Sequence, residues 1–445
     1  MSARIFDTQR FMRDRLRAAL RRGTLGVLDI GSAKISCLVL RIDPERLDAV
    51  RPAGRSAQAG LDAVRVIGFA NTQSRGVRMG EIDAIDEAER GVRTVLSRAQ
   101  KHAGERIDQV AVAISGGAPR SYGVSGAAPV AQGEVTAQDI GAALVSCILP
   151  DFGPGRDVIH AQPVNFTLDH RTGLSDPRGQ VGARLSVDMH MLTAAHAAIR
   201  NLAFVIRRCD LELAGVATAA YAAGLSALVE DEMELGAACV DLGAETTSVS
   251  VFLKRHMIFA DVLRLGAAHV TQDIAHAFAA PLEDAERVKT KHGEVQATGR
   301  DDREMIELRR IGSERDFERR MITRTELIGV IRPRMEEILE DVRLRLDAAG
   351  FDCLPGQRVV LTGGGSQLPG LEDLATRILG RPVRIGRPLR IQGLPQAATA
   401  AQFSALVGLA AHAVRPQDEC WDFELPGRYG PQGLRRALRW FRENW

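Results

Sequence analysis

The chain contains 445 residues, of which 45% are hydrophobic and 26% are charged, and its formal net charge is +2. This length and apolar content allow large buried cores, divided between two or more lobes. A charge so close to zero excludes a general nucleic-acid-binding protein, whose surface would carry a large positive excess, so no nucleic-acid partner is expected.

The six cysteines exclude two further classes of protein. They are scattered, with no Cys-x-x-Cys pair and no histidine at metal-ligand spacing, which argues against a zinc site or a disulfide framework. The sequence has no run of 18 apolar residues, and no secretory hydrophobic stretch follows the basic N-terminal residues. We therefore expect a cytoplasmic protein in a reducing compartment.

Residues 1–24 form a basic N-terminal arm, with seven Arg and two Asp. Apolar side chains recur at helical spacing from Asp7 to Leu20, which predicts a short helix. We interpret this arm as solvated and partly disordered, with contact to a membrane or partner as the alternative. Two apolar runs follow, Leu25 to Ile30 and Lys34 to Leu40, and the short gap between them predicts a β-hairpin.

The next part of the chain alternates between extended and helical patterns. Residues 43–63 are rich in Arg, Pro, Gly and Ala and are expected to form a loose inserted loop. After them, the apolar spacing predicts strands at 64–71, 109–114, 122–130, 157–167 and 183–193, and helices at 82–102, 135–149 and 194–209.

The second half of the chain repeats its beginning. Ala237 to Leu242 and Thr246 to Leu253 form a second strand, turn and strand pattern, and Asp241 follows Asp29 by 212 residues, about half the chain. A duplicated protein with one hairpin in each lobe has this layout. Further on, the spacing predicts helices at 269–280, 281–291 and 325–349, a charged connector at 299–320, a strand at 358–361 and a tether rich in Pro and Gly at 415–432.

Each hairpin has the residue types of a turn that binds phosphate and magnesium. An Asp at a strand end can hold Mg²⁺ through water, a glycine lets backbone N–H groups approach a phosphate, and a lysine adds positive charge. One such motif alone is also typical of a plain surface hairpin, but two could hold a triphosphate and its Mg²⁺ from opposite sides. The first hairpin, LDIGSAK, supplies Asp29, Gly31, Ser32 and Lys34, and the second, VDLGAETT, supplies Asp241, Gly243, Thr246 and Thr247.

Two more segments complete the candidate site. The first, VVLTGGGSQLPGL, is a strand that runs into glycines, on whose bare backbone a base or a ribose can lie; a plain strand-to-helix turn is the alternative. In the second, DAERVKTKHG, Glu286 and Lys289 share a helix face at i, i+3, which is also the spacing of an ordinary surface ion pair. The candidate residues of the glycine segment are Gly363, Gly364, Gly365 and Ser366.

Residues 433–445, GLRRALRWFRENW, have the pattern of a basic amphipathic helix. The apolar side chains fall in one sector, the arginines lie opposite, and an indole lies at the border. The segment is too short to span a bilayer but suits an anionic membrane surface; docking against the protein itself is the alternative. The apolar residues are Leu434, Leu438, Phe441 and Trp445, the border residue is Trp440, and the arginines are Arg435, Arg436, Arg439 and Arg442.

The four site segments, in this order, resemble phosphate loop 1, phosphate loop 2, the ribose-binding helix and the adenosine loop of the actin-like ATPase superfamily. More narrowly, the chain resembles the FtsA family of bacterial cell-division proteins in the phrases QSRGV, VTQDIAHAF, AERVKTKHG, VVLTGGGSQLPGL and VRIGRP. The resemblance implies an α/β, ribonuclease H-like fold of two lobes, with a duplicated core and an extra lobe-1 subdomain. It also implies ATP and Mg²⁺ as ligands, with Asp29 and Asp241 holding the metal through water.

The same resemblance implies partners and a division of the chain. A small lobe-2 subdomain would bind the C-terminal tail of FtsZ, the extra subdomain would bind other division proteins, and the chain would assemble with itself into filaments. The terminal helix would bind anionic lipids on the cytoplasmic face of the inner membrane at the division site. The implied parts are the arm (1–24), lobe 1 core (25–81, with the 43–63 insertion, and 177–214), extra subdomain (82–176), lobe 2 core (215–262 and 322–384), small lobe-2 subdomain (263–321), lobe 1 closing helix (385–414), linker (415–432) and membrane-targeting helix (433–445).

Two features depart from the family pattern. Ala244 and Glu245 stand where the second phosphate loop has its second and third glycines, and Glu245 brings bulk and negative charge close to the phosphates. For a group that orients the attacking water, the chain offers only Thr193 and His196 at the expected place. We therefore expect ATP binding with at most weak hydrolysis. The alternatives are an actin-like pilus-assembly ATPase and a small-molecule kinase of the same superfamily.

Overall fold

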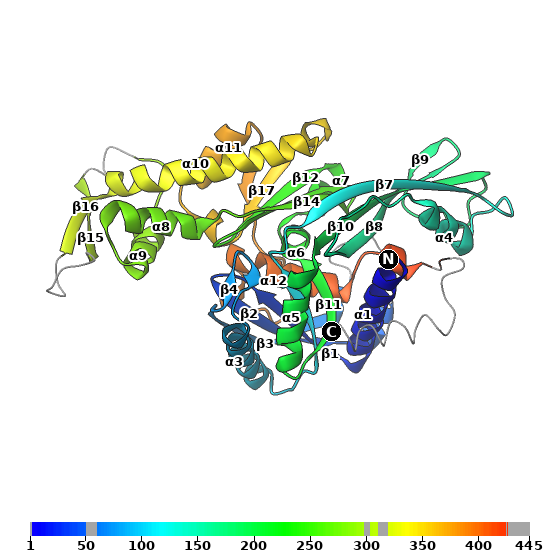
Figure 1. Cartoon of the computed structure of the whole chain (residues 1–445), viewed down its shortest axis with the longest axis horizontal. Coiled ribbons are helices and arrows are strands. Elements are labelled where there is room, and N and C mark those ends of the chain that lie inside the picture. The colour runs from blue at the N-terminus through cyan, green and yellow to red at the C-terminus, as the bar shows by residue number, and fades with distance from the viewer. Residues whose placement is uncertain (1, 50–59, 298–302, 310–318, 424, 426–445) are drawn as a thin grey trace.

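The computed structural model describes residues 2–49, 60–297, 303–309, 319–423 and 425. The expected membrane-targeting helix at 433–445 lies outside these residues, and so do the middle of the inserted loop and the second part of the linker. The described residues form an elongated molecule built on three larger sheets (Figure 1). The ends of the inserted loop are a short helix, α2 (Pro44–Ala49), and a 3-10 turn at Leu61–Ala63.

The first sheet forms lobe 1 and has the strand order β11-β6-β1-β2-β3. β1 is antiparallel to β2 and parallel to β6. Both of its faces are buried, because alternate side chains point to opposite faces and helices cover each: α3 and α5 on one, α1 and α12 on the other. The elements are β1 (Thr24–Ile30), β2 (Lys34–Ile42), β3 (Val64–Gln73), β6 (Gln109–Ile114), β11 (Glu212–Thr218), α1 (Ser2–Arg22), α3 (Ile85–Ala103), α5 (His196–Arg208) and α12 (Ser404–Val414).

The second sheet, in lobe 2, repeats the first with the order β14-β13-β12-β17-β18. The registers match as well, because Asp29 lies opposite Ser36 in the first hairpin and Asp241 lies opposite Ser248 in the second. The predicted duplication is therefore present in the backbone. The elements are β12 (Ala237–Leu242), β13 (Thr247–Leu253), β14 (His256–Leu263), β17 (Arg358–Thr362), β18 (Val383–Ile385), α7 (Glu230–Leu235), α8 (Ala267–Phe278), α9 (Leu282–His292), α10 (Arg324–Ala348) and α11 (Leu371–Leu379).

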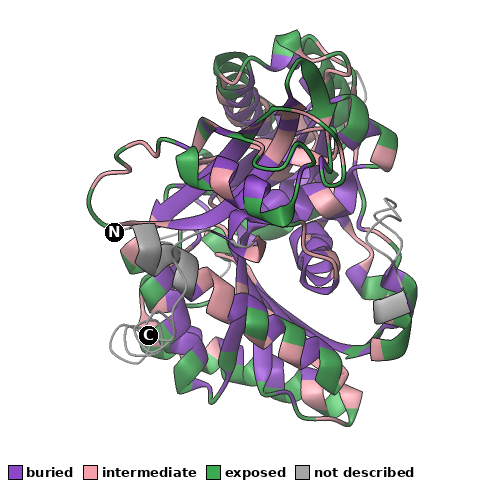
Figure 2. Ribbon diagram, turned by 90° about the vertical axis from the view of Figure 1, so that its right-hand side faces the viewer, coloured by how far each residue is buried: buried purple, intermediate pink, exposed green. Residues whose placement is uncertain are grey.

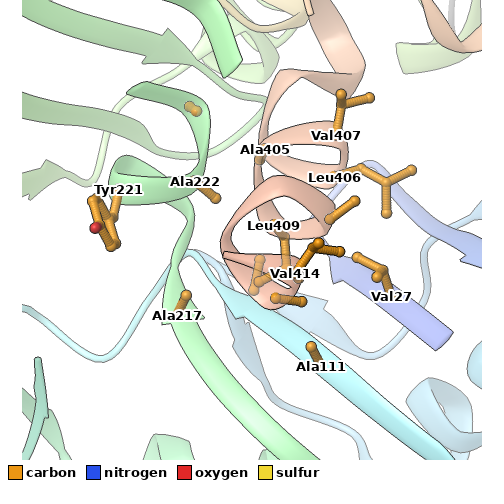
Figure 3. Packing of buried hydrophobic residues seen from close by; sticks show 14 of the residues in the cluster. Val27, Ala111, Ala217, Tyr221, Ala222, Ala405, Leu406, Val407, Leu409 and Val414 are labelled. Atoms are coloured by element: carbon orange, nitrogen blue, oxygen red, sulfur yellow. The ribbon is translucent and has the colours of Figure 1, made fainter. Parts of the chain in front are cut away.

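Two alanine-rich helices pack together where the lobes join. α6 (Ala219–Ala227) follows β11 of the first sheet but contacts β12 and β13 of the second, whereas α12 follows the second sheet and contacts the first. A Cβ on Gly408 of α12 would lie 1.7 Å from the carbonyl oxygen of Ala222 of α6, so the glycine sets how closely the two helices approach. Figure 3 shows this packing beside Val27 and Ala111 of the first sheet.

The extra subdomain is a four-stranded sheet, β7-β10-β8-β9, covered by α4. In Figure 2 the strands of the larger sheets are mostly buried, while exposed residues concentrate on the helices and loops around them. The elements are β7 (Arg120–Pro129), β8 (Arg156–Leu168), β9 (Arg171–Leu174), β10 (Arg184–Ala195) and α4 (Ala137–Ser146), and two short strands, β4 (Val77–Arg78) and β5 (Glu81–Ile82), form a separate hairpin.

The boundaries of this subdomain differ from those expected at residues 82 and 176. α3 and β6 follow residue 82 but belong to the layers of lobe 1, and β10 continues the extra sheet to Ala195. β11 also crosses the expected boundary at 214/215 and lies in the first sheet. Apolar spacing identifies a strand, but hydrogen bonds to distant strands decide which sheet it joins.

The interpretation of the N-terminal arm as solvated is wrong. α1 is a helix of 21 residues whose side chains at Met12, Leu16, Ala19 and Leu20 are buried in the cores of lobe 1. Its Arg13 forms an ion pair of 2.7 Å with Asp422, and both side chains are less than a tenth exposed. The helix is therefore a structural part of the body.

Two segments expected to be irregular are also ordered in part. In the connector at 299–320, β15 (Met305–Arg309) pairs with β16 (Arg319–Thr323), and Ile306, Leu308 and Ile322 are buried in the lobe 2 core. In the linker, Trp421 is only 3% exposed and packs into the core of the extra subdomain. The start of the linker is therefore docked on the body.

Candidate functional site

The two predicted phosphate-binding turns fold in the same way. The N–H of Gly31 donates to the carbonyl oxygen of Lys34 at 3.0 Å, and the N–H of Gly243 donates to that of Thr246 at 2.9 Å. A Cβ on Gly243 would lie 2.7 Å from the Thr246 oxygen, so this turn has no room for a side chain at that position. Glycine is therefore a geometric requirement of the second turn.

Two carboxyl groups from different lobes lie within electrostatic range of one ammonium group. Burial raises the pKa of Asp29, although the positive charge of Lys34 opposes the shift. Burial and then the negative charge of Asp29 raise the pKa of Asp241 to about 7, again against the effect of Lys34. Burial lowers the pKa of Lys34, while both carboxylates act to raise it. The structure thus brings together the two aspartates that the sequence assigned to one site.

Further contacts hold Lys34 and Ser32 in the first turn. Lys34 Nζ donates to the carbonyl oxygen of Gln402 at 2.7 Å and lies 4.9 Å from the centroid of the Phe403 ring. Ser32 Oγ accepts a hydrogen bond from the N–H of Gly80 at 3.0 Å. The first turn is therefore tied both to the segment before α12 and to the turn between β4 and β5.

The side chain of Glu245, in lobe 2, contacts the backbone of lobe 1. Its Oε2 accepts a hydrogen bond from the N–H of Met79 at 2.6 Å. Met79 has a φ of 50°, in the left-handed region that non-glycine residues seldom adopt. The turn at Met79 and Gly80 therefore contacts both predicted phosphate loops. The sequence reasoning missed this turn, although the two glycines at Gly76 and Gly80 were a signal of an unusual backbone.

The glycine segment passes close to Asp241. A Cβ on Gly363 would lie 2.2 Å from Asp241 Oδ1, and Gly363 has a φ of 85°, so the position excludes other side chains. The face of Gly364 is open, because its nearest neighbour would be the Cβ of Gln402 at 3.8 Å. Ser366 is buried and its Oγ donates to the carbonyl oxygen of Gly363 at 2.8 Å, so its hydroxyl supports the turn. Gly365 lies against Leu242 and Ala267.

The two threonines of the second turn are both buried, and one of them has a structural contact. Thr247 Oγ1 donates to the carbonyl oxygen of Leu265 at 2.8 Å, while Thr246 is 7% exposed. The carbonyl oxygens of Gly243 and Ala244 accept hydrogen bonds from the N–H groups of Ala267 and Ala268. The second turn is therefore fastened to the start of α8.

The pair formed by Glu286 and Lys289 is half-buried, because Lys289 is buried while the side chain of Glu286 is 54% exposed. Lys289 is 8% exposed, and its Nζ lies 2.6 Å from Glu286 Oε2, 2.7 Å from Thr271 Oγ1 and 3.0 Å from the carbonyl oxygen of Ala267. These bonds join α9 to α8. Ala267, the first residue of α8, also donates a hydrogen bond to Gly243 of the second turn. The structure thus links the pair to the second hairpin through α8.

The donor set suits a hydrated magnesium ion. Among the described residues there is no cluster of three or more His, Cys, Asp or Glu side chains that would enclose a metal. Two carboxylates, Asp29 and Asp241, converge instead. Mg²⁺ usually keeps several waters and binds one or two carboxylates together with substrate phosphates, so this sparse set fits that ion.

The residues considered for orienting a water molecule have other partners. His196 Nδ1 lies 2.6 Å from Asp157 Oδ2, and Thr193 Oγ1 accepts a hydrogen bond from Arg156 Nε at 2.9 Å. Both residues are therefore engaged within the extra subdomain or at its edge.

The described helices include none with the length and apolar character that a bilayer crossing requires.

Comparison with protein families gives two matches. Residues 238–408 match the model described as cell division protein FtsA, and residues 116–193 match the SHS2 domain inserted in FtsA. The chain is 36% identical over 450 residues to cell division protein FtsA of Agrobacterium fabrum, with 99% of each chain covered. It is 39% identical to that of Rhizobium meliloti, with 87% of each covered, and 30% identical to that of Escherichia coli K12, with 86% of this chain and 88% of the relative covered.

Solved structures share the fold at low sequence identity. The chain of a PilM-PilN type IV pilus biogenesis complex matches with a TM-score of 0.61 at 18% identity, covering 88% of this chain and 99% of that one. MreB5 of Spiroplasma citri bound to ADP matches with a TM-score of 0.52 at 15% identity, covering 87% and 95%. The fold is thus actin-like, as the resemblance implied.

Proposed function

This chain belongs to the FtsA family of cell-division proteins, and from that premise we propose that it binds ATP with Mg²⁺ between its lobes, polymerises and tethers FtsZ filaments to the cytoplasmic membrane. The observation that carries the nucleotide part is the meeting of Asp29 and Asp241 beside Lys34, at equivalent ends of duplicated strands. Opposite lobes then supply the two sides of one phosphate-binding site.

Each part of the site has a distinct role toward the nucleotide. Asp29 and Asp241 hold the hydrated Mg²⁺, which neutralises phosphate charge when it is bound. Lys34 supplies positive charge, and the open face of Gly364 offers bare backbone to the base or ribose. Glu286 and Lys289 fix α9 beside α8 on the ribose side. Gly31, Ser32, Gly243, Thr246, Thr247, Gly363, Gly365 and Ser366 shape the turns around these groups.

Hydrolysis is at most slow in this proposal. Ala244 and Glu245 replace the second and third glycines of the second phosphate loop, and the side chains of Thr193 and His196 are held by Arg156 and Asp157. Nucleotide then acts through binding, because a ligand that contacts both lobes favours the interlobe angle that suits both sets of contacts.

The membrane part of the proposal rests on residues 433–445. Burying Leu434, Leu438, Phe441 and Trp445 gives about 6–10 kcal/mol gross, and four arginines add about 1 kcal/mol each near an anionic leaflet. Ordering roughly 13 residues costs about 1 kcal/mol or more each, so one helix binds weakly. Filaments that present many helices would bind much more tightly through avidity. The protein would therefore lie on the cytoplasmic face of the inner membrane when it is assembled at the division site.

Two subdomains are proposed to bind protein partners. The small lobe-2 subdomain, which contains α8, α9 and the β15–β16 hairpin, would receive the C-terminal tail of FtsZ. The extra subdomain would bind other division proteins. Fluorescence anisotropy with a labelled FtsZ tail peptide tests the first assignment, and no binding at high micromolar protein would refute it.

Titration calorimetry with Mg·ATP tests the nucleotide site. The expected result is binding by the native chain and a loss of at least about tenfold in affinity for Lys34→Ala, since a buried charge partner of the phosphates is removed. Glu340→Gln, at an exposed position of α10, is the control and should bind as the native chain does. Equal affinity of the native chain and Lys34→Ala would refute the site.

Liposome pelleting tests the membrane part. Deleting residues 434–445 should release the protein from anionic liposomes while leaving its circular dichroism spectrum unchanged, and unaltered pelleting would refute the assignment.

One alternative, a pilus-assembly ATPase, shares the fold of the PilM-PilN complex but would not bind the FtsZ peptide. The other, a small-molecule kinase, would transfer phosphate to small acceptors. These two assays separate the three functions.

A further inference from the structure

The docked start of the linker touches both lobes. We name residues 417–422 the strap. Arg13 Nη2 of α1 donates to the carbonyl oxygen of Gln417 at 2.9 Å, and Arg13 also holds Asp422 with two nitrogen atoms. On the other side, the Nε2 of Gln417 donates to the carbonyl oxygen of Arg255, in the turn between β13 and β14 of lobe 2. One residue of the strap therefore bridges α1, which packs on the first sheet, and the second sheet.

The centre of the strap is held by a buried carboxylate. Glu419 is 2% exposed, and its oxygens accept hydrogen bonds from His160 Nδ1 at 3.0 Å and from the N–H of Ala161 at 3.1 Å. His160 Nε2 accepts a hydrogen bond from the N–H of Thr218, which caps α6. Burying a carboxylate is costly unless it is paired, so these contacts specify one docking position for the strap. They also connect the strap to a helix at the lobe junction.

Lobe 2 is held by contacts from the lobe 1 side at both ends of β13. Glu245 precedes this strand and bonds Met79, and Arg255 follows it and bonds Gln417. The seven residues of β13 span about 23 Å. Between these two points, Ala260 of β14 lies opposite Ser250, the middle residue of β13, and its N–H donates a hydrogen bond to Ser121 of the extra subdomain at 2.8 Å. Contacts at two separated points fix an angle between bodies, whereas one contact leaves a pivot.

We propose that the strap and the Glu245–Met79 hydrogen bond are paired braces, through which the docking of the C-terminal segment is coupled to the angle between the lobes. When one brace is broken, lobe 2 can rotate about the brace that remains. This rotation strains the hydrogen bonds of the remaining brace. The strap is therefore an intramolecular ligand whose occupancy depends on the lobe arrangement. Its link to the membrane rests on the proposed function, because residues 433–445 follow the strap in the chain.

Hydrogen exchange and interlobe distances test the coupling on the full chain without nucleotide, so failure here is separate from failure of nucleotide binding. Gln417→Met keeps the side-chain length and removes the donor to lobe 2. Glu245→Gly perturbs the far brace and leaves the strap intact. Glu340→Gln, at an exposed position of α10, is the control. Distances are measured by pulsed electron paramagnetic resonance between labels on Cys353, the exposed cysteine, and on Lys101→Cys in α3.

The expected result is reciprocal. Both Gln417→Met and Glu245→Gly should widen the interlobe distance distribution and speed amide exchange of residues 417–422 by about two- to tenfold, the range for loss of one hydrogen bond. Glu340→Gln should change neither quantity. Unchanged strap exchange and distances in Glu245→Gly would overturn the proposal. So would faster strap exchange in Gln417→Met with native interlobe distances, because the strap would then be only a local docking contact.

Discussion

Asp29 and Asp241 occupy the same place in two duplicated sheets, and the charge of Asp29 adds to burial in raising the pKa of Asp241 to about 7. The duplicated strands have thus brought two acidic side chains within electrostatic range of each other and of Lys34. Such an arrangement is unfavourable for the empty protein and favourable for a bound cation, which is the behaviour expected of a ligand site.

The first prediction concerns stability and pH in the presence of a chelator. The folded chain binds the Asp241 proton more tightly than the unfolded chain, whose carboxyl has its ordinary pKa of 3.8. Stability should therefore fall as the pH rises from about 4 to about 7, by on the order of 2–4 kcal/mol, and then level off. Asp241→Asn should remove much of this slope and be more stable than the native chain at pH 8. Urea unfolding at pH 5, 6, 7 and 8 measures both effects.

The control for this prediction is Glu340→Gln, a neutralised carboxyl at an exposed site on α10. Its free energy of unfolding should depend on pH as that of the native chain does. A native slope in Asp241→Asn would contradict the raised pKa.

The second prediction concerns Glu245. Replacement by Gly removes a negative charge from the second phosphate loop and the bond to Met79, so Mg·ATP should bind about tenfold more tightly. Glu245→Gln keeps an acceptor for the Met79 N–H and removes only the charge. Its affinity for Mg·ATP should lie between those of the native chain and Glu245→Gly. Titration calorimetry at constant pH gives the three affinities. Weaker binding by Glu245→Gly would mean that the carboxylate supports the site rather than opposing the phosphates.

The third prediction concerns the contact between α6 and α12. Gly408→Ala would place a Cβ 1.7 Å from the Ala222 oxygen, so the helices must separate, at a cost of about 1–3 kcal/mol. Gly329→Ala is the matched control, because its Cβ would meet nothing within 4 Å in α10. That change should stabilise the chain by about 0.5–1 kcal/mol. The midpoint of thermal unfolding should fall for Gly408→Ala and rise for Gly329→Ala. Similar shifts of the two midpoints would contradict the close packing of α6 and α12.

The fourth prediction concerns the N-terminal helix. Arg13→Ala leaves the buried carboxylate of Asp422 without its main partner and should destabilise the chain by about 3–5 kcal/mol. Arg21→Ala, at an exposed position of the same helix, should change stability by less than about 0.5 kcal/mol. The fluorescence of Trp421, which is buried beside Asp422, is expected to report the loss of docking. Equal stability of the two variants would show that α1 does not hold the linker.

Sequence patterns predicted the local elements well because their causes are local. The period of apolar residues gave β1, β2, β12 and β13 nearly to the residue, and the half-chain repeat of Asp29 and Asp241 predicted two similar hairpins. The position of Glu245 also marked a departure in the second turn. These features depend on residues a few places apart.

The N-terminal helix shows where this reasoning fails. Its seven arginines suggested a solvated arm, yet Arg13 is buried because its partner, Asp422, comes from the other end of the chain. The Met79–Gly80 turn was missed for the same reason. Its place in the site depends on hydrogen bonds to Ser32 and Glu245, which are distant in the sequence. The sequence alone does not indicate whether a charged residue will pair with an oppositely charged residue from a distant part of the chain.

The amino-acid sequence by itself determined the repeated hairpins, the glycines that their turns need and the helical stripes that cover the sheets, because backbone geometry and apolar period act over short distances. Only the tertiary structure decided that Glu245 reaches Met79 and that the strap lies between α1, β8 and the β13–β14 turn. Those contacts join residues up to hundreds of positions apart, and their energies come from burial and pairing that exist once the lobes have packed.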